Sequence, residues 1–254
     1  GTRVLKANNF YAVSLLFNTA KAPFSDPRVR KAVAHAIDRA ALIRYGAKGN
    51  AVALKSLTMD GQFGHNPGIA GYEFSPAKAK ELLSQAGFAK GLKIKMQVRE
   101  ELKSFGKIIA SQFGSLGIET EPYFVSQERQ FQELAQPKIE GKSAWAGDLA
   151  IAHYVDPTVH SFFPYSIIVY SQSPYSLVAD KQADELFLKM VGAIDPPEQK
   201  RWAWQLEERT WKECLSVSLI QILRPFGLRK SVRYEPYVTG MLDFRHASLD
   251  NGHD

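Results

Sequence analysis

Arg99, His153 and Tyr154 end segments of the chain that are expected to be strands, where their side chains can hold a ligand. A guanidinium binds a carboxylate through two parallel hydrogen bonds, and an imidazole donates or accepts hydrogen bonds near neutral pH. These residue types suit the capture of a polar or anionic solute. Two alternatives stay open: Arg99 can be the last member of an exposed basic row, and His153 can simply pack at a strand end.

The chain carries none of the sequence motifs that identify common catalytic sites. It has no GxSxG elbow, Walker loop, dinucleotide fingerprint or HExxH pair. Adjacent carboxylates such as Glu100 and Glu101 cannot face each other on a helix. The single cysteine, Cys214, excludes an internal disulfide and a CxxC metal site, and we expect it to be a small core residue within a helix. We therefore expect no catalytic residue, no metal ligand and no cofactor.

Other conspicuous residues favour structural roles. Asp156 followed by Pro157 is expected to cap the next turn. Three tryptophans, Trp202, Trp204 and Trp211, lie in one long helical segment and could form an aromatic platform for a ligand. Their spacing fits packing in a core or at an interface between lobes better.

Composition places the chain among ordinary globular proteins. It has 254 residues, of which 45% are hydrophobic and 23% charged, enough for one large domain or two small ones. The formal net charge is +6, but lysine and arginine are scattered among acidic residues, so we expect no nucleic-acid partner. No run of about 18 apolar residues occurs, and no membrane-spanning helix is predicted.

Strand-like and helix-like segments alternate along the chain and must position these side chains. Predicted strands cover residues 10–17, 92–99, 118–125, 148–153 and 217–223. Predicted helices cover residues 27–37, 38–45, 76–86, 101–116, 128–135, 181–192 and 195–215, and residues 46–74 are expected to form a long excursion. This alternation predicts an α/β fold with a mixed or parallel sheet covered by helices. Ligands of such sheets bind beyond the carboxyl ends of strands, which again selects Arg99, His153 and Tyr154.

Four segments carry a more specific pattern. They read PFSDPRVRKAV with AIDR (residues 23–33 and 36–39), FSPAKAKELL with AGF (74–83 and 86–88), LGIET (116–120), and DLA followed by Tyr154 and Asp156 (148–156). In this order they resemble the extracytoplasmic solute-binding proteins of family 5, which serve peptide, dipeptide and nickel ABC transporters. Asp195 with Arg201, and the helix that leads to Val217-Ser218-Leu219, complete the series, so the resemblance covers roughly residues 10–230.

The resemblance implies a lobe of the type II periplasmic-binding-protein fold, with a mixed sheet flanked by helices. Family members have two lobes that close over a ligand, and they are about twice as long as this chain. All matched segments belong to the family's carboxyl-terminal lobe. We therefore expect residues 1–226 to form that lobe, and residues 227–254 to form a tail that crosses back toward an amino-terminal lobe outside this sequence.

The resemblance also implies the partners and the location. The expected partners are a small-molecule or peptide ligand, the membrane permease of an ABC transporter and the amino-terminal lobe. The expected location is periplasmic or otherwise extracytoplasmic, with or without a lipid anchor, and with the signal segment outside this sequence. A ligand-sensing domain of the same fold in a transcriptional regulator is the alternative function.

The chain departs from the family at residues expected to face the ligand. Peptide-binding members carry Gly-Trp and then Asp-Tyr on the ligand-facing strand, and the acid holds the amino terminus of the peptide. Here Leu149 and Ala150 replace Gly-Trp, and His153 replaces the acid. A neutral imidazole gives an ammonium no comparable partner, so peptide recognition through the amino terminus is in doubt. The resemblance leaves Arg99, His153, Tyr154 and Asp156 as ligand-binding candidates, with Tyr154 able to stack on the ligand.

Overall fold

The computed structural model describes residues 1–140, 142–237, 239 and 243–249. The strands are β1 (Thr2–Phe17), β2 (Ala51–Ala53), β3 (Leu92–Arg99), β4 (Ile118–Val125), β5 (Lys138–Ile139), β6 (Lys142–Ser143), β7 (Leu149–Val155), β8 (Ser216–Arg229), β9 (Val232–Arg233) and β10 (Ser248–Leu249). The helices are α1 (Pro27–His35), α2 (Arg39–Ala41), α3 (Pro76–Gln85), α4 (Lys103–Gly114), α5 (Gln127–Leu134), α6 (Phe162–Ile168), α7 (Lys181–Gly192) and α8 (Pro196–Lys212). A π-helical turn over Leu42–Gly46 follows α2, and a 3-10 turn over Glu100–Leu102 precedes α4.

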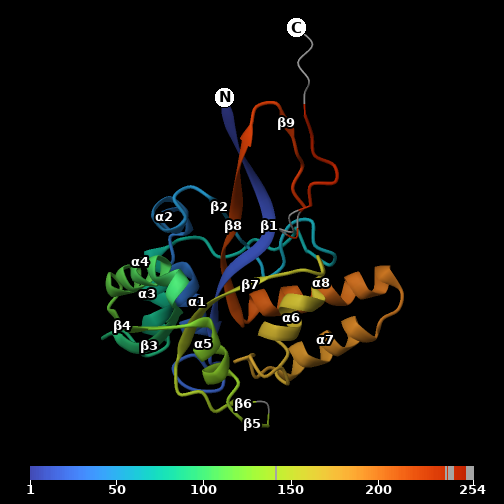
Figure 1. The fold of residues 1–254 in the computed structure, drawn as a ribbon. Helices are drawn as coiled ribbons and strands as arrows, with labels where there is room; N and C mark the ends of the chain where they lie inside the picture. Colours follow the sequence, from blue (N-terminus) through green and yellow to red (C-terminus); the bar gives the residue numbers. More distant parts are fainter. Residues whose placement is uncertain (141, 238, 240–242, 250–254) are drawn as a thin grey trace.

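A six-stranded mixed sheet organises the molecule, in the order β2-β8-β1-β7-β3-β4. Strand β3 runs parallel to β4 and β7, whereas β1 runs antiparallel to β7 and β8. Strand β7 and the second half of β1 are apolar over most of their length because helices cover both of their faces (Figure 1). The predicted α/β fold with a mixed sheet flanked by helices is confirmed.

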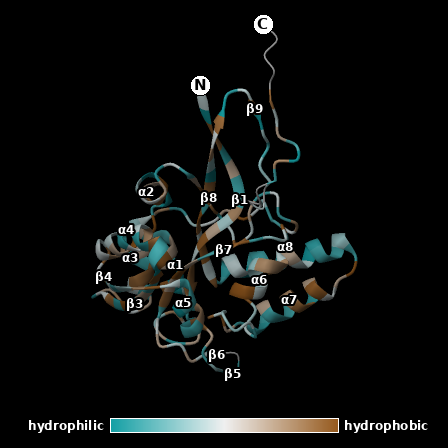
Figure 2. Ribbon diagram, in the orientation of Figure 1, coloured by the Kyte–Doolittle hydropathy of each residue, from teal (hydrophilic) through white to brown (hydrophobic). Residues whose placement is uncertain are grey.

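The two faces of the sheet belong to two hydrophobic cores. Val13, Leu15 and Phe17 of β1 pack into the core formed with α1, α3 and α4, whereas Ala12 and Leu16 pack into the core formed with α6, α7 and α8. Successive side chains of a strand alternate between faces, so a single strand serves both cores. Figure 2 shows hydrophobic and hydrophilic stretches side by side on α7 and α8, as expected for helices with one buried face.

Several local predictions are confirmed. Strands β3 and β4 have the predicted bounds. Asp26 and Ser75 cap α1 and α3 through their side chains, each followed by proline in the first helical position, where its missing N–H costs nothing. Helix α4 ends at Gly114, before the predicted end at residue 116, and Gly117 lies in the turn into β4 with a φ of 79°, a conformation that glycine adopts without strain.

Three sequence predictions are corrected. Strand β1 begins at Thr2 rather than at residue 10, because its polar first half pairs with the end of β8 outside the cores. Helix α6 was not predicted, since no side chain caps it and Pro164 lies within its first turn. Cys214 is fully buried as expected but follows α8 rather than lying within it, with a left-handed φ of 50° in the turn toward β8. None of the described helices is long and apolar enough to cross a membrane.

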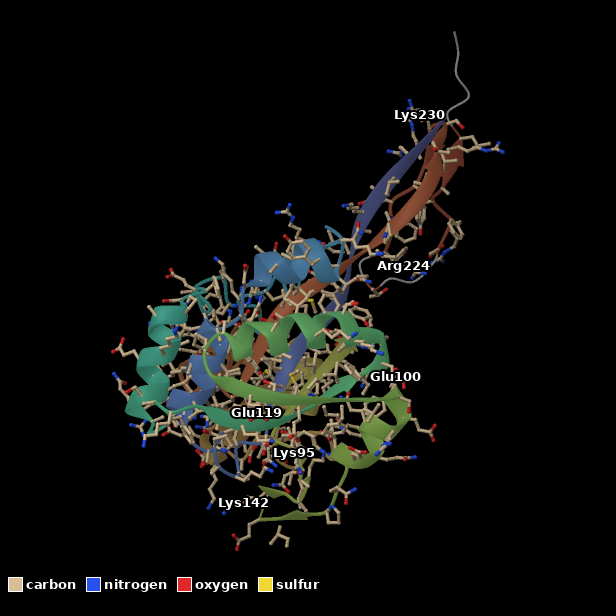
Figure 3. The ribbon with its side chains drawn as sticks, turned by 90° about the vertical axis from the view of Figure 1, so that its left-hand side faces the viewer. Lys95, Glu100, Glu119, Lys142, Arg224 and Lys230 are labelled. Atoms are coloured by element: carbon tan, nitrogen blue, oxygen red, sulfur yellow. The ribbon has the colours of Figure 1, made fainter. Side chains whose placement is uncertain are left out.

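Strands β1 and β8 continue beyond the body of the molecule as a two-stranded ribbon, in which residues 2–7 pair with residues 224–229. Figure 3 labels Arg224 and Lys230 on this projection. The pairing shifts register between Ala7 and Tyr11, where buried Phe10 has a φ of 45°. The expected lobe boundary at residue 226 falls within β8. The expected tail, residues 227–254, lies partly outside the described residues.

Candidate functional site

A cavity of about 390 Å³ lies between α5, the ends of β3 and β7, and α6. Its walls are largely apolar: α5 contributes Phe131 and Leu134, and α6 contributes Phe163 and Ile167. Arg99 and His153 line the cavity at the carboxyl ends of their parallel strands, the edge at which α/β sheets bind ligands. Glu100, which directly follows β3, marks this end of the strand in Figure 3.

Arg99 is the buried cation of this cavity, with only 2% of its surface exposed. Its Nε donates a hydrogen bond to Oε1 of Gln130 at 2.5 Å, and its guanidinium carbon lies 4.8 Å from the ring centre of Phe131. Its Nη1 lies 3.4 Å from Nδ1 of His153 and 3.9 Å from Oε1 of Glu101. Within the described residues, Nη2 of Arg99 has no hydrogen-bond acceptor. The guanidinium therefore keeps donor capacity for a molecule in the cavity.

At neutral pH, Arg99 of this cluster is charged and His153 is neutral. Burial lowers the pKa of Arg99, while Glu101 and Tyr11 act in the opposite direction. A guanidinium nevertheless stays protonated in proteins. Burial and the nearby Arg99 lower the pKa of His153 to about 4, against the opposing effect of Glu101. Burial also raises the pKa of Tyr11 to about 12, and its ring stacks on His153 with centroids 4.5 Å apart.

The alternative prediction that Arg99 belongs to an exposed basic row is wrong. Lys93 at the start of β3 is exposed, but Gln97 and Arg99 are buried. Helix α5 covers this half of the strand: Gln130 accepts a hydrogen bond from Arg99, and Oε2 of Glu133 accepts one from Nε2 of Gln97 at 2.6 Å. The alternation of the strand indicated which side chains share a face. It did not reveal that a helix covers part of that face.

Tyr154 and Asp156 have mainly structural partners. Tyr154 lines the cavity, but it is 6% exposed and its hydroxyl donates to the carbonyl of Leu57 at 2.5 Å. Asp156 is fully buried and accepts hydrogen bonds from the backbone N–H groups of Thr158 and His160. The predicted turn cap at Asp156 is confirmed. The structure thus brings Arg99, His153 and Tyr154 to one cavity, whereas Asp156 does not line it.

The tryptophans do not form part of this cavity. The indole N–H of Trp204 donates to the carbonyl of His65, and that of Trp211 to the carbonyl of Gly71. Neither these two residues nor Trp202 lines the cavity. Trp202 and Trp211 are half-buried, whereas Trp204 is exposed, so a packing role for all three stays a prediction. In the part of the chain that the structure describes, no group of three or more His, Cys, Asp or Glu side chains could hold a metal ion.

Sequence reasoning did not identify Tyr11, Gln130, Phe131 or Tyr175 as site residues. For α5 a signal was present: Gln130 lies four residues before Leu134 on the helix face that packs inward, so a polar side chain at residue 130 had to be buried. A buried amide needs partners, and Arg99 is one of them. For Tyr11 and Tyr175 no comparable signal exists, since each reaches the cluster from a distant part of the chain.

Comparison with known proteins gives a consistent result. The family model described as bacterial extracellular solute-binding proteins, family 5 Middle, matches residues 1–161. Heme-binding protein A of Haemophilus influenzae is 25% identical over 154 residues, which are 58% of this chain and 28% of that protein. The dipeptide-binding protein of Escherichia coli is 36% identical over 80 residues, which are 32% of this chain and 15% of that protein.

Solved structures share the fold. The periplasmic binding protein DppA of Helicobacter pylori, in complex with the peptide STSA, superposes with a TM-score of 0.79 at 22% identity. The superposition covers 98% of this chain and 49% of DppA. The chain therefore spans about half the length of this structural relative, and a smaller share of the two sequence relatives.

Proposed function

This chain belongs to the bacterial extracellular solute-binding proteins of family 5, and from this premise we propose that its cavity captures a small anionic solute for an ABC importer. The observation that carries the proposal is Arg99, a buried cation that faces the cavity without a hydrogen-bonded carboxylate partner. Glu101, with its Oε1 3.9 Å from Nη1 of Arg99 and its side chain 41% exposed, is an ion-pair partner beyond hydrogen-bond distance. A buried charge normally has a hydrogen-bonded partner of opposite charge, because burial without one is costly. A carboxylate of the ligand would supply that partner.

The walls of the cavity define the rest of the ligand. Phe131, Leu134 and Phe163 offer apolar surface, so the proposed solute carries an apolar group beside its carboxylate. Because His153 is neutral at pH 7, it does not offer a negative partner for an ammonium. A peptide-like solute held by its carboxyl end, or another organic acid, fits these groups better than a peptide held by its amino terminus.

We further infer that the cavity is one wall of a cleft between two lobes. The support is the coverage of about half of a structural relative, together with a cavity that opens at the carboxyl ends of the strands. In this arrangement residues 1–226 form the lobe, and residues 227–254 lead toward the second wall. Ligand capture would favour the closed state of the lobes, and an extracytoplasmic permease surface would recognise that state.

Calorimetric titration of the chain with two blocked dipeptides tests this proposal. N-acetyl-Ala-Phe has a carboxylate and no ammonium, whereas Ala-Phe-amide has an ammonium and no carboxylate. We expect N-acetyl-Ala-Phe to bind, and Arg99→Met to weaken its binding about 10- to 150-fold, the equivalent of one charge-assisted hydrogen-bonded contact. Lys95→Met, which removes an exposed cation from the same strand, is the matched control. Equal binding by Arg99→Met, or preferential binding of Ala-Phe-amide, would overturn the proposal.

A further inference from the structure

Lys138 lies in β5, four residues after the end of α5, and its ammonium is surrounded by backbone carbonyls. Its Nζ lies 2.6 Å from the carbonyl oxygen of Ser171, 2.5 Å from that of Ser173 and 2.6 Å from that of Ser176. An ammonium has three donor protons, so these three contacts use its whole donor capacity. Short hydrogen bonds with one charged partner are the strong ones.

The three carbonyls belong to the segment between α6 and α7, residues 169–180, which we call the α6–α7 loop. This loop carries Tyr175, which lines the cavity. The ring of Tyr175 contacts that of Phe131 on α5, with centroids 5.0 Å apart. The two walls of the cavity are thus connected in two places, by this aromatic pair and by Lys138.

The charge on Lys138 is directed at the loop and not at an acidic side chain. Burial lowers the pKa of Lys138 to about 8, and Asp184 of α7 raises it, so the ammonium remains largely protonated at pH 7. Asp184 itself accepts hydrogen bonds from the backbone N–H of Ser171 at 2.7 Å and from its hydroxyl at 2.5 Å. The loop is therefore fixed to α7 by Asp184, and to the segment after α5 by Lys138.

We propose that Lys138 is a positioning residue that sets the width of the cavity, because its ammonium holds the α6–α7 loop, and with it Tyr175, against α5. The inference rests on the proposed function, since the width of the cavity affects ligand selectivity only if the cavity binds a solute. Without the ammonium, three carbonyl oxygens that converge on one point lose their common donor. Their free energy is then lower when they separate and accept hydrogen bonds from water, which moves the loop away from α5.

Hydrogen exchange of the unliganded chain tests the first step. In Lys138→Met, which keeps the length of the side chain but removes its charge, we expect the amides of residues 171–178, other than Pro174, to exchange about 10- to 100-fold faster. The matched control is Lys142→Met, which removes an exposed lysine of the adjoining strand β6 (Figure 3). Amides of α4 report on global unfolding. Unchanged exchange of residues 171–178 in Lys138→Met would overturn the proposal.

Chemical rescue separates carbonyl binding from simple packing. Lys138→Ala removes the atoms that propylammonium supplies, so added propylammonium should restore slow exchange of residues 171–178. Propan-1-ol, which has a similar chain and no charge, should not restore it. Equal restoration by both molecules would show that the side chain acts by filling space, and would overturn the proposed role of the ammonium.

Ligand selectivity tests the second step. The probes are N-acetyl-Ala-Phe and N-acetyl-Ala-Ala, which share the carboxylate and differ in apolar width. We expect Lys138→Met to reduce the preference for the phenylalanyl probe about fivefold, while global destabilisation would weaken both probes equally. A faster-exchanging loop with unchanged preference would refute the positioning role. If neither probe binds the unchanged chain, the proposed function fails, whereas exchange and rescue still decide whether Lys138 holds the loop.

Discussion

The substitution His153→Asp places a carboxylate where relatives that bind peptides are expected to have one. From the sequence alone, restored recognition of a peptide amino terminus would be the expected result. The structure changes this expectation, because Nη1 of Arg99 lies 3.4 Å from Nδ1 of His153. An aspartate oxygen occupies nearly the same position as the imidazole Nδ1. The new carboxylate should therefore pair with Arg99 and not with a ligand ammonium.

The expected loss of ligand affinity in His153→Asp follows from competition between the new carboxylate and the ligand carboxylate for Arg99. A hydrogen bond to a charged group contributes about 1.5–3 kcal/mol, and the ligand carboxylate has to displace this internal pair. We expect N-acetyl-Ala-Phe to bind about 10- to 150-fold more weakly to His153→Asp than to the unchanged chain. The variant should also resist urea better, since Arg99 gains an ionised partner. Glu101, whose Oε1 lies 3.5 Å from Nδ1 of His153, is 41% exposed at its side chain and can turn toward water.

Calorimetric titration measures both binding constants, with His153→Asn as the control of equal size and no charge. We expect His153→Asn to retain most of the affinity for N-acetyl-Ala-Phe. Tight binding of this probe by His153→Asp would show that Arg99 is not the carboxylate contact. A gain of affinity for Ala-Phe-amide would show that residue 153 faces the ligand ammonium, and the reasoning from the Arg99–His153 distance would fail.

Three further predictions concern stability. Folding lowers the pKa of His153 from 6.5 to about 4, so the contribution of neutral His153 to stability is complete above pH 6.5 and is lost as the pH falls through 4. The expected loss of unfolding free energy is on the order of 3 kcal/mol. His153→Gln should reduce this pH dependence in urea titrations at stepwise pH. Gln130→Leu removes the acceptor of Nε of Arg99 and one donor to the carbonyl of Ile151, so urea denaturation should show a loss of about 2–4 kcal/mol, whereas exposed Gln132→Leu should show less than about 0.5 kcal/mol. Gly117→Ala forces a side chain into a left-handed backbone conformation, and calorimetry should show a lower Tm, equivalent to about 1–2 kcal/mol.

Local sequence signals predicted most of the elements that form the sheet. The strict alternation of residues 92–99 predicted β3, and the sequence of Asp26 and Pro27 predicted the start of α1, because both signals act within a few residues. Helix α6 gave no such signal, since Ser161 makes no side-chain cap and Pro164 interrupts its pattern. Its absence from the prediction concealed one wall of the cavity.

The site itself depends on contacts between distant segments. Arg99 and His153 could be selected because strand ends meet at one edge of the sheet. The burial of Arg99 could not be predicted, because it depends on how α5 packs over β3. The hydrogen bond between Arg99 and Gln130 becomes evident only once the position of α5 is known. Tyr175 approaches Phe131 from a loop more than 40 residues away along the chain, and no local pattern indicates such a pair.

The shift of register beside Phe10 gives the projecting ribbon a point of low stiffness. Regular pairing of two strands resists bending, and the pairing of β1 with β8 is interrupted between Ala7 and Tyr11. A force on the free end of the ribbon should therefore bend it at this register shift. Tyr11 is the next residue and stacks on His153. Tyr11 therefore connects the register shift to His153, and bending of the ribbon should displace the groups that surround Arg99.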